Sequence, residues 1–332
     1  MSSTGTEKRD KLPGLEGLRA LATIGIFLFH SGFLLQGTFP VTLFFMLSGF
    51  LMYYTKSEQI ERTSFVEWVH GYVRYKVRQF YPLHFITFLI ACVVGRVLSK
   101  ISADMLIGAA LDLMLIHPFF PKYALIFNGL AWFLAVIIFL YIVAYPLQKA
   151  LNRMKNAVVP ALLTILAIIL LNLLNRFGFE LYLYTNPFYR ILDFLLGMLI
   201  AKMYVDKKYA IRKSNCVELF LVAVFVIQYI ASLFISGDPG YYSILFAVSL
   251  YVFAVGEGCV STLLKSRFLA KIASYSFEFY MIHELALRVF RKVFSESIFY
   301  PIRLILITLP ALAVSIAFAV CYKSICKRIK HA

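Results

Sequence analysis

The stretch Gly17-Leu-Arg19-Ala-Leu-Ala-Thr-Ile-Gly-Ile-Phe-Leu-Phe-His30 places a cation and an imidazole inside the first long apolar segment of the chain. A charged side chain at the centre of a membrane helix costs roughly 2.5–3.5 kcal/mol on insertion scales, so such residues usually face a polar interior. At about 100° per residue the two side chains lie on one helix face, about 16 Å apart along the axis. We therefore expect Arg19 and His30 to take part in chemistry.

The composition predicts an integral membrane protein. The chain has 332 residues, of which 61% are hydrophobic and 15% charged, and its mean hydropathy is +0.80. A soluble protein of this size does not need so much apolar surface to fill one core. The first apolar run lacks the small-residue cleavage pattern of a signal peptide, so we expect it to remain as a membrane span.

The fold class that we expect is all-α, a polytopic bundle of about ten transmembrane helices. We expect one transmembrane domain over residues 1–332, without an appended soluble domain, in the plasma (inner) membrane. Stretches of about twenty apolar residues mark the spans. They are 15–35, 38–55, 81–98, 127–147, 157–174, 188–205, 215–235, 241–260, 268–287 and 302–322.

The basic residues give the expected orientation. With ten spans, 23 of the 33 Lys and Arg residues fall on the side that holds both termini, and eight fall on the other side. Cytoplasmic loops are enriched in Lys and Arg, so we expect both termini to be cytoplasmic.

Two segments depart from this regularity. Residues 103–120 are apolar enough for an eleventh span, but they contain Asp104, Asp112 and His117, and we interpret them as re-entrant or interfacial. Arg288, Arg291 and Lys292 fall on the non-cytoplasmic side, against the charge rule. Either these bases snorkel outward or they meet something acidic.

Several partners are excluded. The net charge of +16 is explained by topology and by attraction to anionic membrane lipids, so we expect no nucleic-acid partner. The five cysteines form no CxxC pair, and neither a disulfide framework nor a metal site is expected.

The segment between the second and third spans, residues 56–81, is the most informative loop. Arg74, Lys76 and Arg78 stand within one or two helical turns at the expected cytoplasmic surface. They could bind a polyanion such as coenzyme A. They could equally be topology determinants or the anion gate of a transporter.

An ordered set of motifs resembles the acyltransferase type 3 family of membrane O-acyltransferases. The set comprises Gly17-Leu-Arg19 with His30, Phe44-Phe45-Met-Leu-Ser48-Gly49-Phe50, Tyr81-Pro82, Trp132-Phe-Leu with Tyr145-Pro146, Tyr189-Arg190-Ile-Leu-Asp193-Phe-Leu-Leu-Gly197, and Ser274-Tyr-Ser276 ahead of His283. The resemblance covers residues 13 to about 320. It implies a ten-helix bundle that transfers an acyl group, usually acetyl from acetyl-CoA on the cytoplasmic side, to a hydroxyl of a surface polysaccharide or its lipid-linked precursor.

The family's residues transfer unevenly to this chain. Its arginine and histidine on the first helix match Arg19 and His30 at the same spacing. Its cytoplasmic Arg-x-x-Arg falls on Lys76 and Gln79, with Arg74 and Arg78 out of register. Where some members carry a glutamate after the fourth-span tryptophan, this chain has Ile137.

Acyl transfer to a sugar needs a base for the hydroxyl proton and groups that hold the donor. We assign His30 as the general base, because an unperturbed imidazole titrates near pH 6.5. Arg19, which is always charged, is expected to fix the donor.

Other buried polar residues are assigned to the substrate or to structure. Arg190 and Asp193, spaced i, i+3, form either a structural ion pair or part of the substrate pore. Trp132 and His283 are candidates for acceptor binding. Ser48 either lets the first two spans approach closely, together with Gly49, or orients His30.

Two other functions compete with acyl transfer. A secondary transporter or lipid-linked glycan flippase also uses about ten helices and buried charges, but it should show inverted repeats, and none is evident. A sensor or scaffold would have little use for the shared face of Arg19 and His30.

Overall fold

The regular secondary structure of the protein is helical wherever the chain is described. The computed structural model describes residues 9–35, 37–95, 101–206, 215–234 and 242–331. The α-helices are α1 (Pro13–Ser31), α2 (Thr38–Glu61), α3 (Phe65–Trp68), α4 (Arg74–Val94), α5 (Ala103–Leu113), α6 (Ala131–Arg153), α7 (Val158–Arg176), α8 (Pro187–Val205), α9 (Asn215–Phe234), α10 (Tyr242–Val255), α11 (Cys259–Leu264), α12 (Arg267–Val293) and α13 (Tyr300–His331). A π-helical segment, Val69–Val73, joins α3 to α4, and two 3₁₀ turns, His117–Phe119 and Pro121–Tyr123, follow α5.

Within the described residues, five helical segments are long and apolar enough to cross a membrane. They are Phe65–Val94, Ala131–Arg153, Val158–Arg176, Asn215–Phe234 and Tyr300–Ile329. In those of α7 and α9 only 17% of the residues in the apolar stretch are buried within the protein, so most of their apolar side chains face outward. These helices fit a membrane protein, whereas the full count of ten spans and the side of the termini stay predictions.

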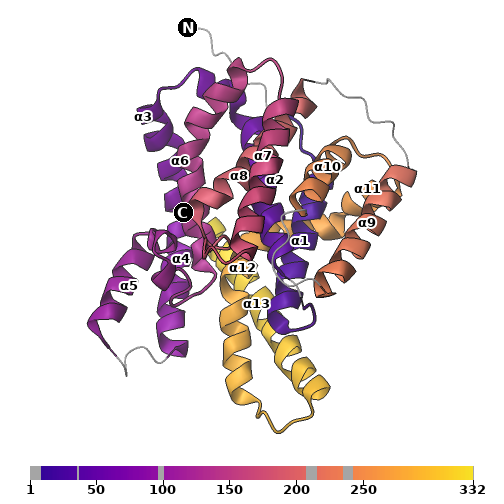
Figure 1. Ribbon diagram of the computed structural model, residues 1–332. Helices are drawn as coiled ribbons and strands as arrows, with labels where there is room; N and C mark the ends of the chain where they lie inside the picture. The colour runs from indigo at the N-terminus through magenta and orange to yellow at the C-terminus, as the bar shows by residue number, and fades with distance from the viewer. Residues whose placement is uncertain (1–8, 36, 96–100, 207–214, 235–241, 332) are drawn as a thin grey trace.

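The other five expected spans correspond to α1, α2, α8, α10 and α12. These helices are shorter or more polar, and they contribute much of the main cluster of buried apolar side chains. A helix that is surrounded by other helices can carry polar groups that lipid would not tolerate. Figure 1 shows α12 and α13 as a hairpin that projects from the lower end of the bundle.

The expected loop at residues 56–81 is mostly helix. α2 continues to Glu61, and α3, the π segment and α4 run without a break from Phe65 to Val94. This second helix starts with a capping box. Ser64 Oγ accepts a hydrogen bond from the backbone N–H of Glu67, and the Glu67 carboxylate accepts one from the backbone N–H of Ser64. The turn between the two helices is therefore short.

The segment that could have been an eleventh span forms only a short helix. α5 has 11 residues and is about 16 Å long, half of the hydrocarbon thickness of a bilayer. Leu115 has a left-handed backbone conformation, with φ of 58°, which does not continue the helix, and the two 3₁₀ turns follow. This agrees with the interpretation of residues 103–120 as re-entrant or interfacial.

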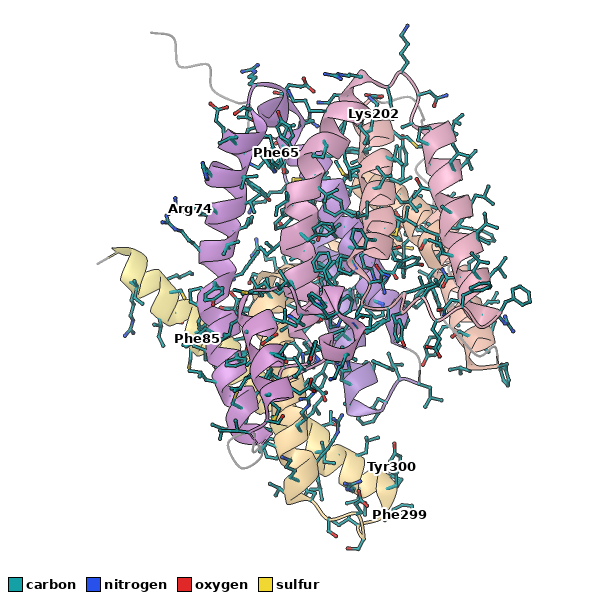
Figure 2. The ribbon with its side chains drawn as sticks, turned by 60° about the vertical axis from the view of Figure 1, so that its left-hand side comes forward. Phe65, Arg74, Phe85, Lys202, Phe299 and Tyr300 are labelled. Atoms are coloured by element: carbon teal, nitrogen blue, oxygen red, sulfur yellow. The ribbon has the colours of Figure 1, made fainter. Side chains whose placement is uncertain are left out.

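Residues at the two ends of the bundle agree with the expected separation of the loops. Phe65 and Lys202 lie at one end, and Phe299 and Tyr300 lie at the other (Figure 2). Some bases used for the charge count lie outside the described residues. They are Lys8, Arg96, Lys100, Lys207, Lys208, Arg212 and Lys213.

Glycines hold α2 and α8 in direct backbone contact. A Cβ on Gly49 would lie 1.9 Å from the carbonyl oxygen of Phe194, and a Cβ on Gly197 would lie 2.0 Å from that of Met46. The expectation that Gly49 brings the first two spans together is therefore wrong, because its partner is α8. Sequence alone does not identify which helix a small residue faces.

We predict that Gly49→Ala destabilises the protein. The new methyl group meets a backbone oxygen that no rotamer change can move, so we expect a loss at or above the 1–3 kcal/mol that is typical of overpacking. Thermal unfolding of the detergent-purified protein measures this. Gly71→Ala is the matched control, because nothing lies within 4 Å of its Cβ position. Equal melting temperatures for the two variants would contradict the close contact of α2 and α8.

Candidate active site

Two side-chain contacts join α1 to α12. Thr23 Oγ1 donates a hydrogen bond of 2.8 Å to Ser276 Oγ, and His30 Nδ1 lies 2.8 Å from His283 Nε2. Each pair is separated by 253 positions, so the two helices run parallel and keep one register for about two turns. A parallel orientation is what the ten-span arrangement expects of its first and ninth spans.

The hydrogen bonds of the histidine pair assign its protons. His283 Nδ1 lies 3.2 Å from the carbonyl oxygen of Phe279, which can only accept, so this nitrogen carries the proton. His283 Nε2 then accepts from Nδ1–H of His30. Because a neutral imidazole carries one proton and that of His30 is on Nδ1, its Nε2 is unprotonated. The second histidine thus holds the first in the tautomer that a general base requires.

Aromatic rings surround the pair. His283 is fully buried, and its ring contacts Phe27, Phe279 and Tyr280 at centroid distances of 5.5–6.0 Å. Its ring stands 5.1 Å from that of His30. An apolar surround excludes water and fixes the rotamers, so the pair is pre-organised.

His30 itself opens onto a cavity. α1 ends at Ser31, the residue after His30. Gly32 follows in a left-handed conformation, with φ of 94°, and caps the helix. The cavity has a volume of about 560 Å³ and is lined by the ends of α1 and α4 and by the hairpin of α12 and α13. This volume lies within the usual range for small-molecule sites.

A second polar region surrounds Arg19, about three turns from His30. In the part of the chain that the structure describes, its guanidinium has no hydrogen bond or ion pair. Lys76 lies within electrostatic range of Arg19 and of Lys56. Both lysines stand over the ring of Tyr72, at 5.4 Å for Lys56 and 5.7 Å for Lys76.

The aromatic side of this region is fixed by packing. Trp68 stacks on Tyr72 at 4.5 Å and donates a hydrogen bond of 2.8 Å to the carbonyl oxygen of Tyr141. Tyr72 lies in the π-helical segment, a feature that is frequent at functional sites. Three cations and a stack of aromatic rings are a suitable surface for a ligand with phosphates and a planar base.

The structure divides the three bases that the sequence grouped on α4. Lys76 is half-buried beside Tyr72, whereas Arg74 and Arg78 are exposed, and Arg74 points away from the bundle (Figure 2). Residues two apart on a helix are about 200° apart, so Lys76 cannot share a face with Arg74 and Arg78. Arg19 and Lys56 are its neighbours instead.

The comparisons with known proteins now give the class of enzyme. Residues 12–321 match the acyltransferase 3 family, which is described as an acyltransferase domain. The chain belongs to this family. It is also similar to the acyltransferase MdmB of Streptomyces mycarofaciens, with 24% identity over 87% of this chain and 82% of that protein. No solved structure matches the chain. The protein is therefore an acyltransferase.

In this acyltransferase Arg190 and Asp193 form a fully buried ion pair on α8. Arg190 Nη1 lies 2.6 Å from Asp193 Oδ2 and 3.3 Å from Thr42 Oγ1, and the guanidinium also donates to the carbonyl oxygen of Tyr184. Its carbon stands 5.9 Å from the ring of Trp132, which is buried as well. The geometry favours the structural role for all three residues, and their contact with substrate stays a prediction.

Ser48 does not reach the histidine pair through a hydrogen bond within the described residues. His283 orients His30 instead. The sequence could have indicated this, because Thr23 and His30 are spaced by seven residues, as are Ser276 and His283. Lys56 and Tyr72 were missed because nothing in their spacing separates them from ordinary membrane-surface residues.

A further buried group of polar side chains lies beside α5 of the acyltransferase. His117 Nδ1 stands 3.2 Å from Asp112 Oδ1, and His84 Nε2 stands 3.1 Å from the carbonyl oxygen of Asp112. Burial raises the pKa of Asp112 to about 8 and lowers the pKa of His117 to about 3, so the pair is neutral at pH 7. Within the described residues no group of three or more side chains is arranged to hold a metal ion.

We predict that Asp193→Asn destabilises this acyltransferase. The change leaves the Arg190 guanidinium buried without its counter-charge, which typically costs about 3–5 kcal/mol. Thermal unfolding and the yield of monodisperse protein measure the loss. The double variant Arg190→Met/Asp193→Leu should recover stability and transfer activity. A stable Asp193→Asn protein with a raised KM for the acceptor would contradict the structural role.

Proposed function

We propose that this acyltransferase is a multi-pass O-acetyltransferase of the plasma (inner) membrane, built as a single transmembrane domain. It transfers acetyl from acetyl-CoA, bound at the cytoplasmic face, to a sugar hydroxyl of a surface polysaccharide or of its lipid-linked precursor. The observation that carries the proposal is the hydrogen-bonded pair of His30 and His283 at the wall of a cavity, from which we infer that Nε2 of His30 is unprotonated. Membership in an acyltransferase family also favours this function over a transporter or flippase.

The reaction follows from the tautomer of His30. Nε2 of His30 accepts the proton of the acceptor hydroxyl while the hydroxyl oxygen attacks the carbonyl carbon of the thioester. The carbon–sulfur bond then breaks, and the imidazolium returns its proton to the departing thiolate. His283 stays hydrogen-bonded to Nδ1–H throughout and keeps the ring in place. His283 acts as a positioning residue, because His30 is the group that touches the reacting atoms.

The donor occupies the region of Arg19, Lys56 and Lys76. Within the described residues none of these three cations forms an ion pair with a carboxylate, although Glu16 acts on Arg19 at longer range, and a polyanion would supply further negative charge. The stacked rings of Trp68 and Tyr72 offer a face for the adenine. About 16 Å of helix separates Arg19 from His30, a span that the extended pantetheine arm bridges with the acetyl group at its tip.

The outward faces of the bundle contact lipid. α7 and α9 carry rows of exposed leucine, isoleucine, valine and phenylalanine. Burying this surface in a bilayer is favourable at about 25 cal/mol per Å². The acceptor reaches His30 through the cavity at the opposite end from Lys202, so donor and acceptor enter from different ends.

We predict that His30→Ala lowers acetyl transfer about 10²–10⁴-fold, the usual contribution of a general base, while the protein still folds. His283→Leu should lower kcat less severely, with no change in KM for acetyl-CoA. His283→Gln should restore much of kcat, because its amide oxygen can accept from Nδ1–H of His30.

The readout is mass spectrometry of surface glycans and of in vitro products, where transfer adds one acetyl unit. A His30→Ala protein that keeps more than about a tenth of the wild-type rate would contradict the general-base role. Equal rates for His283→Leu and His283→Gln would show that His283 acts only by filling space.

We predict that Lys76→Gln and Lys56→Gln raise the KM for acetyl-CoA in a salt-sensitive way, with little change in kcat. Arg74→Gln and Arg78→Gln are matched controls on the outer face of the same helix. A rise of KM that is larger in the Arg74 and Arg78 variants would place the donor on the exposed face of α4. Kinetics at two ionic strengths on all four purified variants distinguish these results.

A further inference from the structure

The cavity beside His30 is strongly basic, and the function proposed above does not account for this charge. Its lining includes Arg288, Arg291, Lys292 and Arg303, together with Glu296. Glu296 lies on the outside, with its side chain 93% exposed, and its Oε1 is 3.8 Å from Nη2 of Arg303. The wall of the cavity therefore carries an excess of positive charge.

The partly buried carboxylate of Glu284 does not cancel this excess. Arg288 Nε and Arg291 Nη1 both contact Oε1 of Glu284, at 3.2 and 3.1 Å, so two cations share one anion. The ammonium of Lys292 contacts a backbone carbonyl, that of Val94. Arg291 also donates to the backbone carbonyl oxygen of His30. This contact holds the Arg291 guanidinium beside the residue that carries the catalytic ring.

Topology does not explain these bases. The hairpin that carries them lies at the end marked by Phe299 and Tyr300, opposite Lys202 (Figure 2). The charge rule for membrane proteins places Lys and Arg at the cytoplasmic end, which we expect to be that of Lys202. Bases that gather at the other end and converge on a cavity attract a ligand of opposite charge.

We infer that the cavity binds an acceptor that carries an anionic group, a phosphate or a carboxylate, close to the hydroxyl that is acetylated. The inference rests on the proposed function, since it names the class of sugar that meets His30. Guanidinium groups bind both anions through paired hydrogen bonds. An acidic sugar or a sugar phosphate would place its anion on Arg303 and Lys292 and its hydroxyl against Nε2 of His30.

The test measures occupancy of the cavity directly. Diethyl pyrocarbonate acylates accessible imidazoles, and peptide mass spectrometry follows the modification of His30 in the full-length protein in phosphatidylcholine nanodiscs. The probes are glucose, glucuronate, glucose 1-phosphate and inorganic phosphate. Glucuronate and glucose 1-phosphate should slow the modification in proportion to occupancy, about tenfold at about ten times their Kd, whereas glucose should have little effect.

Variants assign the protection to the bases of the cavity. The double variant Lys292→Gln/Arg303→Gln should lose protection by both anionic sugars, and salt should weaken protection in the wild type. Arg176→Gln is the matched control, because Arg176 is an exposed base at the end of α7 outside the cavity. Equal protection by glucose, or full protection in the double variant, would overturn the inference.

Two further arms separate other sources of the anion. Repeating the measurement in phosphatidylglycerol nanodiscs without sugar tests whether a lipid headgroup occupies the cavity, and strong protection there would overturn the inference. A raised KM for acetyl-CoA in the double variant would assign the bases to the donor and would overturn it too. Protection of His30 reports binding and does not require turnover, so the test of the inference is independent of the activity of His30→Ala. Persistent acetyl transfer by His30→Ala would overturn only the proposed function.

Discussion

The parallel contact of α1 with α12 is the constraint on which the site depends. It brings together two histidines 253 positions apart and fixes both the distance and the direction of their hydrogen bond. The Thr23–Ser276 bond, seven residues earlier on each helix, keeps the helices in this register. A rotation of one helix by a single residue, about 100°, would separate both pairs at once. The tautomer of His30 is thus a property of helix packing.

The rest of the bundle supports this contact by removing freedom elsewhere. Gly49 and Gly197 lock α2 to α8 through backbone contact, and the pair of Arg190 and Asp193 ties α8 to the aromatic side chains around Trp132. Each of these features is costly to disturb, because an overpacked backbone or an unpaired buried charge has no means of relaxation. The interior helices can therefore hold polar groups while the outer helices remain apolar.

The sequence predicted those features that a single helix determines. Helical periodicity alone placed Arg19 and His30 on one face, and each of the ten apolar stretches that hydropathy marked overlaps a helix in the described chain, whereas the helix at 65–80 was expected to be a loop. It failed where two helices must be combined, so Gly49 was assigned to the wrong partner and His283 was not recognised as the orienting group. The separation of Lys76 from Arg74 was available from the helical repeat, and grouping by position in the sequence hid it. Contacts between distant segments depend on the rotation of each helix, which no local pattern specifies.

A second histidine, in the place where soluble hydrolases use a carboxylate, suits a site within a membrane. A carboxylate behind His30 would have to be buried as a charge, at a cost of several kcal/mol, before any reaction began. The neutral ring of His283 accepts the same hydrogen bond without that cost, and its own proton is held by the carbonyl oxygen of Phe279. Cations lie on either side of the pair along the helix, Arg19 toward the start of α1 and Arg291 beside the carbonyl oxygen of His30. The aromatic rings around His283 keep the ring behind His30 neutral and fixed, so the proton of the acceptor hydroxyl moves a short distance to a nitrogen that is already oriented.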